Sequence, residues 1–400
     1  MSILFTPMNI GKMEVKNRFV HSATYESMAL ENGQVTDDLI KRYTNLAKGE
    51  IGLIIPGYMY VHPGGKALNF QVAIHSNEMI SGLRRLVEAV HAGGAQIAFQ
   101  LVHSGLQSFK SVIGKAPLGP TNKIRNPWSF EKPEELNEEQ IREIIEAFAK
   151  AAGRAAEAGA DAVQLHGAHG YLISEFLSPF LNRRKDRWGG SAENRFRFVG
   201  EVIKEIKKIL PDEMPIFIKI NVNDYTPRTG ITPELAKKYA GRLVELGIDA
   251  IEVSCGTYFS PYTSRGDVPI DYFADIAVKL GLPKWMKFLA KLNMKKQASK
   301  IGFEEGYNLE GAKLIKPALG DIPLILVGGM RRLSHMEEVL ENKYADFISI
   351  SRPLIREPSL VKRFKEGKAD ETACVSCNNC LAAVFNGLPL RCYNQGLPAY

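Results

Sequence analysis

The sequence is poor in cysteine, with five residues in 400, and no apolar run reaches the roughly 18 residues that a membrane-spanning helix needs. Residues 1–7 lack a basic region followed by a long apolar core, so we expect no secretion signal. We find no G-x-G-x-x-G after an early strand, no nucleic-acid-binding motif and no fixed-period repeat. These absences predict a cytoplasmic protein with no membrane span and no nucleic-acid partner.

Net charge is modest, because 51 Lys and Arg face 44 Asp and Glu. The charge is spread along the chain, apart from one Lys-rich stretch at residues 284–300. We interpret that stretch as a solvated helical surface, and the alternative is attraction of an anionic substrate or partner. Hydrophobic residues make up 45% and charged residues 24%, which excludes disordered, collagen-like and disulfide-scaffold proteins.

Short apolar runs alternate with longer segments of helical spacing. Runs of this kind are typical of strands buried on both faces. The eight runs are residues 17–24, 51–58, 96–101, 162–167, 216–221, 250–255, 324–329 and 347–352. Helical patterns lie at 77–92, 138–158, 192–209, 232–246 and 334–341. Thr232 before Pro233 is typical of a helix start. The alternation predicts an α/β fold, a (β/α)8 TIM barrel.

Three segments exceed what such a barrel needs. They are a loop at 102–133, an insertion at 256–307 after strand six, and a tail beyond residue 358. Long loops after barrel strands lie over the C-terminal face, where active sites form. We therefore predict a barrel over residues 1–358, in which 256–307 is a helical lid, and a Cys-rich tail over 359–400.

Polar residues follow several predicted strands. Gln100 lies near the end of strand three, Lys219 is in strand five, and strand four runs into His166, His169 and Tyr171. These three could cap the next helix, and the two histidines could bind zinc. Several such groups at one rim instead favour a shared catalytic site.

Several segments are similar to the old yellow enzyme family of FMN-dependent barrels. They are LFTP at 4–7, KNRF at 16–19, HGAHGYLI at 166–173, EFLSP at 175–179, RWGGS at 187–191 and ENR at 193–195. The resemblance implies that Gln100 bonds the pyrimidine side of FMN and that Lys219 lies near N1 and the C2 carbonyl. It places Ala23 and Thr24 along the ring. It also implies that the FMN phosphate is bound by Gly328, Gly329, Ser351 and Arg352.

The resemblance also implies catalytic roles. His166 and His169 would donate hydrogen bonds to a substrate carbonyl, and Tyr171 would give a proton to the adjacent carbon. This is the chemistry of an ene-reductase acting on an alkene conjugated to a carbonyl or thioester, with NAD(P)H as a possible electron donor. One departure is Tyr25, where some relatives carry a cysteine. Tyr58 and Tyr60 are interpreted as packing or as an aromatic box for a methylated amine.

Four cysteines crowd the tail, at Cys374, Cys377, Cys380 and Cys392. In a chain without a secretion signal this clustering favours a [4Fe–4S] cluster, with a four-cysteine zinc site, unliganded thiols or disulfides as alternatives. The tail resembles a subgroup that includes 2,4-dienoyl-CoA reductase and trimethylamine dehydrogenase. Members of that subgroup usually have one more residue between the second and third cysteines. Cys255 alone is interpreted as a core residue.

No dinucleotide-binding fingerprint follows Cys392. We therefore expect reduction by NAD(P)H or by an electron-donor protein acting through the cluster. The leading hypothesis is an ene-reductase with a small-molecule substrate. The alternatives are an oxidative amine dehydrogenase or demethylase, and an electron-transfer subunit. We also expect a homo-oligomer.

Overall fold

A closed parallel barrel organises the chain, whose computed structural model describes residues 2–259, 261–279, 282–299 and 301–397. Among these residues nine strands share one sheet; eight close the barrel, because β4 pairs with both β3 and β6. The barrel strands are β3 (Phe19–His21), β4 (Leu53–Ile54), β6 (Gln96–Val102), β9 (Ala162–Gly167), β10 (Ile216–Asn221), β11 (Ala250–Ser254), β12 (Leu324–Val327) and β13 (Phe347–Ile350). The ninth, β5 (Met59–Tyr60), pairs with the end of β6. The predicted TIM barrel is confirmed.

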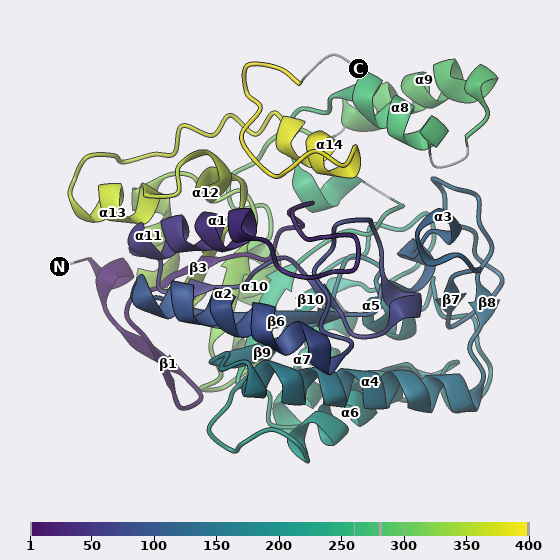
Figure 1. Cartoon of the computed structure of the whole chain (residues 1–400), viewed down its shortest axis with the longest axis horizontal. Coiled ribbons are helices and arrows are strands. Elements are labelled where there is room, and N and C mark those ends of the chain that lie inside the picture. Colours follow the sequence, from purple (N-terminus) through teal and green to yellow (C-terminus); the bar gives the residue numbers. More distant parts are fainter. Residues whose placement is uncertain (1, 260, 280–281, 300, 398–400) are drawn as a thin grey trace.

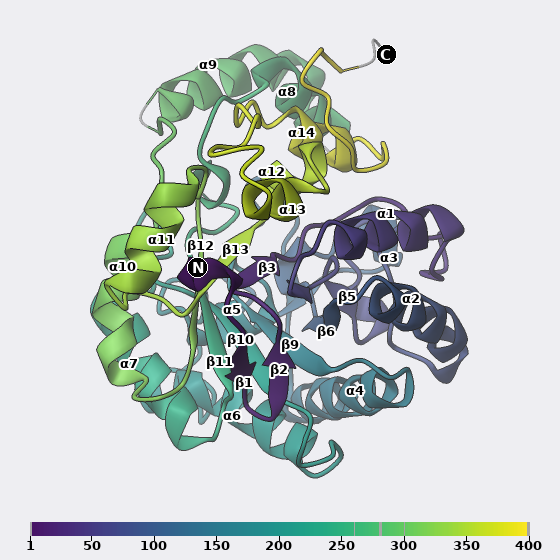
Figure 2. The same ribbon diagram turned by 90° about the vertical axis from the view of Figure 1, so that its left-hand side faces the viewer.

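Helices surround the barrel (Figures 1 and 2). They are α1 (Asp37–Lys48), α2 (Ile80–Ala92), α4 (Glu138–Glu157), α6 (Ala192–Lys207), α7 (Pro233–Glu245), α10 (Leu309–Ile315), α11 (Leu333–Glu341), α12 (Arg352–Arg356) and α13 (Leu360–Lys365). Their starts follow capping chemistry: the Leu235 N–H donates to Thr232 Oγ1 at 3.3 Å, and Pro233 is the first helical residue. The predicted start of this helix is therefore confirmed. No helix in the described part of the chain is long and apolar enough to cross a membrane.

Several predicted strands are longer than the observed ones. The run at 51–58 contributes only Leu53–Ile54 to the sheet, and the run at 17–24 only Phe19–His21. A strand ends where the neighbouring strands no longer form backbone hydrogen bonds with it, and an apolar run in the sequence does not show where that happens. The residues beyond each strand enter the loops at the C-terminal face, and they carry Tyr58 and Thr24 to that face.

An antiparallel hairpin that the sequence analysis did not identify covers the other end of the barrel. Strand β1 (Met8–Ile10) pairs with β2 (Met13–Val15). Gly11 in the turn has φ of 55°, and a Cβ there would lie 2.8 Å from Asp249 Oδ1, so the turn requires glycine. Strands this short carry almost no periodic signal, which explains the omission.

The barrel interior changes from apolar to polar along its strands. One layer joins the hairpin in an apolar cluster and includes Ala98, Ala162, Phe217, Ala250 and Phe347. Side chains that point to the same face of a strand recur every two residues. Each of the same five strands carries a buried polar residue two positions further along. These residues are Gln100, Gln164, Lys219, Glu252 and Ser349. The alternation therefore places a polar layer directly above the apolar one.

Loops and short helices cover the C-terminal face (Figures 1 and 2). The helices here are α3 (Lys110–Ile113), α5 (Leu172–Leu177), α8 (Ile270–Lys279), α9 (Lys287–Ala298) and α14 (Asn379–Phe385). The loop after β6 also contains two short paired strands, β7 (Leu118–Gly119) and β8 (Glu134–Glu135). Helices α8 and α9 form the predicted insertion, of which residues 260, 280–281 and 300 lie outside the described residues, as do 398–400 of the tail. The tail contacts the barrel, since Leu390 N–H donates to Glu26 O at 2.8 Å.

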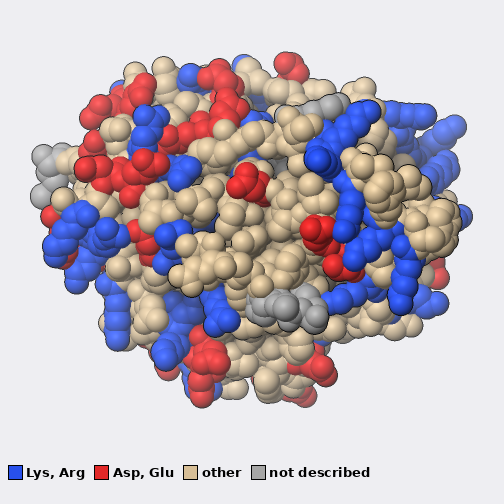
Figure 3. Space-filling model, turned by 90° about the horizontal axis from the view of Figure 1, so that it is seen from above, with Lys and Arg blue, Asp and Glu red and all other residues tan. Residues whose placement is uncertain are grey.

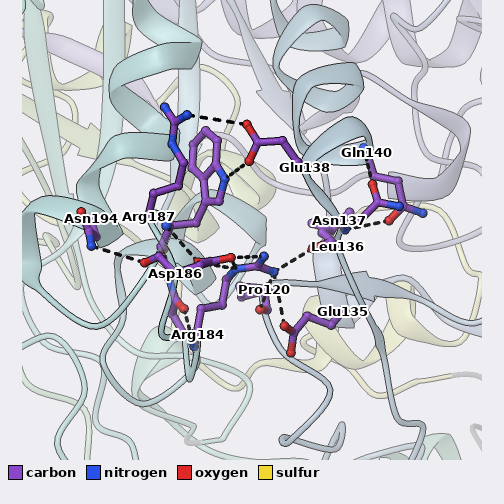
Figure 4. A network of polar contacts seen from close by, with 12 residues as sticks. Pro120, Glu135, Leu136, Asn137, Glu138, Gln140, Arg184, Asp186, Arg187 and Asn194 are labelled. Carbon is purple, nitrogen blue, oxygen red and sulfur yellow. Dashed lines mark hydrogen bonds and ion pairs between the residues drawn. The ribbon is translucent and has the colours of Figure 1, made fainter.

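The RWGGS segment belongs to a polar network beside α4 (Figure 4). Trp188 is 2% exposed and its Nε1 donates to Glu138 Oε2 at 2.5 Å. Arg184 donates to Leu136 O at 2.7 Å and pairs with Asp186 at 2.5 Å. These contacts fix the loop after β9 against the start of α4. Part of the family resemblance therefore marks a structural anchor and not the cavity.

Candidate active site

The polar layer of the barrel forms a continuous hydrogen-bond network. Gln100 Nε2 donates to Gln164 Oε1 at 2.6 Å, and Gln164 Nε2 donates to Glu252 Oε2 at 2.8 Å. Glu252 Oε2 also lies 3.2 Å from Lys219 Nζ, with both side chains at most 3% exposed. A buried charge pair needs further hydrogen bonds to offset its desolvation, and Ser22 and Ser349 supply them to Glu252 Oε1 at 2.9 and 2.8 Å.

A cavity of about 730 Å³ opens above this network. It is within the range of about 300–1,000 Å³ that is typical of cofactor and substrate sites. Nine of the predicted catalytic and FMN-binding residues line it: Ala23, Thr24, His169, Tyr171, Lys219, Gly328, Gly329, Ser351 and Arg352. Gln100 and His166 are not among the lining residues; they are buried behind the wall.

Two histidines and a tyrosine lie together where β9 ends. The ring centroids of His166 and His169 are 5.1 Å apart, and those of His166 and Tyr171 are 4.6 Å apart. His169 has φ of 62°, a strained value that the contact of its N–H with Asn221 Oδ1 at 3.1 Å helps to hold. Its Nε2 lies 2.7 Å from Ser254 Oγ.

Both imidazoles are neutral near pH 7. Burial, aided by the positive charge of Lys219, lowers the pKa of His169 from 6.5 to about 3. Burial lowers the pKa of His166 well below 6.5, with further lowering by His169 and Lys219. Because the Ala168 N–H donates to His166 Nδ1 at 3.4 Å, the proton of that ring is on Nε2. A neutral imidazole of this kind donates one hydrogen bond without carrying charge.

Tyr171 is held protonated, because burial raises its pKa to about 12 and only partial relief comes from a hydrogen bond with Tyr58. Tyr58 stacks on Tyr25 at 6.0 Å and lies 5.1 Å from Tyr171, and all three line the cavity. Tyr60 does not line the cavity; it stacks on His75 at 5.1 Å. Of the two predicted tyrosines, Tyr58 therefore lines the cavity, whereas Tyr60 packs elsewhere, and Tyr25, which was not predicted, joins Tyr58 at the cavity.

The glycines after β12 and the residues after β13 form the opposite end of the predicted cofactor site. Gly328 and Gly329 have φ of 142° and 71°, conformations that favour glycine. Ser351 Oγ lies 2.7 Å from Thr24 Oγ1, which ties this end to β3. The Arg352 guanidinium also holds the insertion and the tail, since Nη1 donates to Arg265 O at 2.8 Å and Asn378 Oδ1 at 2.7 Å.

The residues present fit FMN. Gln100 Oε1 is buried and has no hydrogen-bond partner among the described residues, so an acceptor is left available at the barrel interior. Lys219 supplies a buried cation at the cavity surface, and the Gly328-Gly329 turn allows close approach of a backbone to a phosphate. The Lys219 cation suits an electron-rich ring at one end of the cavity, and the backbone of the Gly328-Gly329 turn suits an anion at the other end.

The four tail cysteines gather around one small pocket. Cys374, Cys377, Cys380 and Cys392 line a space of about 20 Å³ beside Arg352, and Cys374 and Cys380 also line the main cavity. All four are free thiols. Burial raises the pKa of Cys380 to about 11. No three His, Cys, Asp or Glu side chains within the described residues are grouped closely enough to hold a metal ion. The predicted metal centre is therefore not confirmed.

Glu252 is the main site residue that the sequence analysis missed. It is fully buried and organises the network beneath the cavity. Its signal was an acidic residue inside an otherwise apolar strand, two positions after Ala250 and therefore on the inward face. Cys255, by contrast, is buried in the main core as predicted.

Comparison with known proteins shows extended similarity. NADH oxidase of Thermoanaerobacter brockii is 35% identical over 396 residues, which cover 97% of this chain and 55% of that protein. The 4,4'-dithiodibutanoate disulfide reductase of Rhodococcus erythropolis is 31% identical over 388 residues, covering 96% of this chain and 93% of that one. A solved structure of 2-naphthoyl-CoA reductase with 2-naphthoyl-CoA matches 98% of this chain and 56% of that chain, with a TM-score of 0.85 and 27% identity.

The chain thus spans about half the length of two of these proteins and nearly all of the third. Residues 3–267 match the model of a single family, described as NADH:flavin oxidoreductase / NADH oxidase. That match covers most of the barrel, including β3 to β11 and the HGAHGYLI segment. It confirms the resemblance found in the sequence: this chain belongs to the NADH:flavin oxidoreductase / NADH oxidase family.

Proposed function

We propose that this protein is an FMN-dependent ene-reductase that acts on an alkene conjugated to a carbonyl or thioester. The observation that carries the proposal is that the ring of His166 lies 5.1 Å from that of His169 and 4.6 Å from that of Tyr171, so that two neutral imidazoles and a protonated phenol meet beside the cavity. Such a cluster offers hydrogen-bond donors to an oxygen and one acid to a carbon. Family membership supports the flavin.

FMN would be held at both ends of the cavity. Lys219, Ala23 and Thr24 line the cavity and would bind its ring, and Gln100, buried behind the wall, would contribute its unpaired Oε1. Gly328, Gly329, Ser351 and Arg352 would bind the phosphate. When bound, FMN supplies the hydride. Lys219 contributes a fixed positive charge that favours an electron-rich ring, and Glu252 holds that lysine in place.

The histidines orient the substrate. His169, which lines the cavity, would donate to its carbonyl oxygen, and His166, which is buried just behind the wall, would reach the same oxygen once substrate is bound. Both would act as neutral groups, since burial keeps their pKa values well below 6.5. Polarising this carbonyl makes the β-carbon electrophilic. Tyr171, protonated at pH 7, would deliver the proton to the α-carbon.

Apolar side chains support an extended, largely apolar substrate. Phe273, Met286 and Met294 of the α8–α9 insertion line the cavity. The structure of 2-naphthoyl-CoA reductase, a similar barrel, is a complex with 2-naphthoyl-CoA, an aromatic thioester. NADH or NADPH is the proposed electron donor, in keeping with the family.

An oxidative amine dehydrogenase or demethylase is the second candidate. The stacked pair Tyr25 and Tyr58 favours it, because aromatic faces attract methylated ammonium groups. A protein that only transfers electrons is the third candidate, and turnover of any small substrate by the isolated chain contradicts it.

We propose further that the four tail cysteines bind one [4Fe–4S] cluster, with zinc as the alternative. The four cysteines line one pocket, which supports the choice of ligands, but they would have to move closer together to hold a metal, because no three of them are grouped closely enough in the described structure. Protein purified under strict anaerobic conditions is expected to contain iron and sulfide in cluster proportion. Zinc without iron would make the tail a structural element, and absence of both metals contradicts the proposal.

The main test is an anaerobic half-reaction experiment. NADH or NADPH should bleach the flavin absorbance, and a conjugated enone or enoyl thioester should restore it. The matched variant is His166→Ala with His169→Ala, which should weaken binding of phenolic carbonyl mimics while FMN stays bound. If a methylated amine reduces the flavin without nicotinamide, and no conjugated alkene reoxidises it, the second candidate replaces the first.

A further inference from the structure

The α8–α9 hairpin carries large apolar side chains that the rest of the described chain does not cover. Trp285, Phe288, Leu289 and Leu292 are 75%, 68%, 54% and 50% exposed. Only five other large hydrophobic residues in the described part of the chain are comparably exposed, and those are scattered from residue 30 to residue 385. Single exposed apolar residues are ordinary, whereas a group of four in one hairpin indicates a contact surface.

Two sides of the segment at 285–294 carry apolar side chains. Met286, in the 3-10 turn Lys284–Met286 that precedes α9, and Leu289 and Met294 of α9 line the cavity. Trp285 of the turn and Phe288 and Leu292 of α9 do not line it, and they are spaced by three and four residues, so they lie near one another. We call these three residues the outer stripe. No residue of α9 is buried, so this helix is a thin partition between the cavity and the solvent.

Lysines surround the outer stripe. Lys287 pairs with Asp275 of α8, and Lys291 pairs with Asp271 of α8 at 2.6 Å. These two ion pairs hold α9 against α8. The remaining described lysines of this stretch are exposed, and they are Lys284, Lys295 and Lys296. Figure 3 shows basic side chains gathered at the end of the molecule where Figure 1 places α8 and α9.

We propose that the outer stripe docks this protein on an anionic lipid surface. Exposed Trp, Phe and Leu beside lysines suit a membrane interface, where apolar side chains lie among the acyl chains and lysines face the headgroups. The exposed lysines complement anionic headgroups. Figure 2 shows α9 at the outer edge of the molecule, where a flat surface can reach it. Docking places one wall of the cavity against the lipid.

Other occupants fit less well. In a two-fold contact between copies of this chain, the same lysine-rich patch would face itself, and like charges would oppose association. Lysine is depleted in the centres of protein–protein interfaces, and their aromatic anchors are seated in pockets. The outer stripe is instead exposed and flanked by lysines, which favours a fluid, negatively charged surface.

Vesicle flotation of the full-length protein tests the proposal. We expect binding to vesicles of phosphatidylcholine mixed with phosphatidylglycerol, weaker binding at high salt, and little binding to phosphatidylcholine alone. The variant Trp285→Ser/Phe288→Ser/Leu292→Ser should weaken binding about 10-fold or more through loss of apolar insertion. The variant Lys284→Glu/Lys295→Glu/Lys296→Glu should weaken it about 100-fold, at about fivefold for each lost lysine.

Matched controls separate this surface from net charge. Lys41→Glu/Lys48→Glu/Lys237→Glu changes three exposed lysines of α1 and α7 by the same total charge, and it should retain most of the binding. All variants should keep their FMN content and far-ultraviolet circular dichroism, because the altered side chains are exposed. Equal binding by the wild type and both hairpin variants overturns the proposal. So does a self-association in sedimentation velocity that the Ser variant abolishes, since the stripe would then be a subunit interface.

Discussion

Glu252 Oε2 lies 3.2 Å from Lys219 Nζ in the closed layer beneath the cavity. Of these two side chains, only Lys219 lines the cavity. The Glu252 carboxylate accepts hydrogen bonds from Ser22, Gln164 and Ser349. The position of the cation is therefore set by a residue that a bound molecule does not touch. Glu252 is a positioning residue, and its effect on the cavity is electrostatic.

Replacing Glu252 tests this relationship. Glu252→Gln removes the negative partner, so the net positive charge at the cavity floor rises and an anionic reduced flavin is favoured. We expect the reduction potential of bound FMN to rise by about 30 mV, one tenfold step for a two-electron couple, measured by spectroelectrochemical titration. Ser349→Ala, which removes a hydrogen bond but keeps the charge, should change it much less. An unchanged potential in Glu252→Gln would show that the pair does not influence the ring.

The same pair predicts a stability effect. Removing one member of a buried ion pair leaves an uncompensated charge, at a loss of about 3–5 kcal/mol in the free energy of unfolding. We expect Glu252→Gln to lower stability by about this amount in urea denaturation of the FMN-free protein. The double variant Lys219→Met/Glu252→Gln should recover much of the loss. A double variant as unstable as the sum of its single changes argues against coupling.

Tyr171→Phe tests the proposed proton donor. Loss of a general acid slows a reaction by about 10²–10⁴-fold. We expect that decrease in flavin reoxidation by a conjugated alkene in stopped-flow measurements, with reduction by NAD(P)H unchanged. Tyr25→Phe is the matched control, because it also lines the cavity but is not placed to supply the proton. Equal rates for Tyr171→Phe and wild type would assign proton delivery elsewhere.

Buried neutral histidines predict sensitivity to acid. Burial lowers the pKa values of His21, His103 and His169 from 6.5 to about 3. Between pH 6.5 and pH 3 the unfolded chain binds more protons than the folded one. The contribution of these histidines to the free energy of unfolding is therefore fully present above about pH 6.5, and it is lost as the pH falls toward 3. Each histidine contributes about 1.4 kcal/mol per pH unit within that window.

Urea denaturation between pH 7 and pH 4 measures this slope. His169→Gln removes one titrating group and should make the decline shallower. A slope that is identical in wild type and His169→Gln contradicts the assignment of neutral buried imidazole to His169.

Trp188→Phe separates structural from catalytic meaning in the RWGGS segment. The change removes the N–H that donates to Glu138 and leaves most of the ring in place. We expect a loss of about 1 kcal/mol in unfolding free energy, with turnover unchanged. Trp285→Phe, at an exposed position, should leave both quantities unchanged. A large loss of turnover in Trp188→Phe would show that the anchor also positions the cavity.

The alternation of apolar runs and helical segments was enough to predict the barrel, because strand burial on both faces leaves a mark in every run. The residues at strand ends were predictable for the same reason: the topology brings all carboxyl ends to one face. The hairpin of β1 and β2 and the lengths of β3 and β4 were not predictable. They depend on which neighbours offer ladder partners, and that is set by residues distant in sequence.

By itself, the sequence determined the fold class, the family and the strand ends from which the site is built. Only the tertiary structure decided which of those side chains meet. It joined Glu252 to Lys219, moved Gln100 and His166 behind the cavity wall, and left Tyr60 outside. It also gathered the four tail cysteines at one pocket and exposed the outer stripe. The reason is physical: periodicity records burial within one element, whereas charge pairing and exposure depend on distances between elements that lie far apart along the chain.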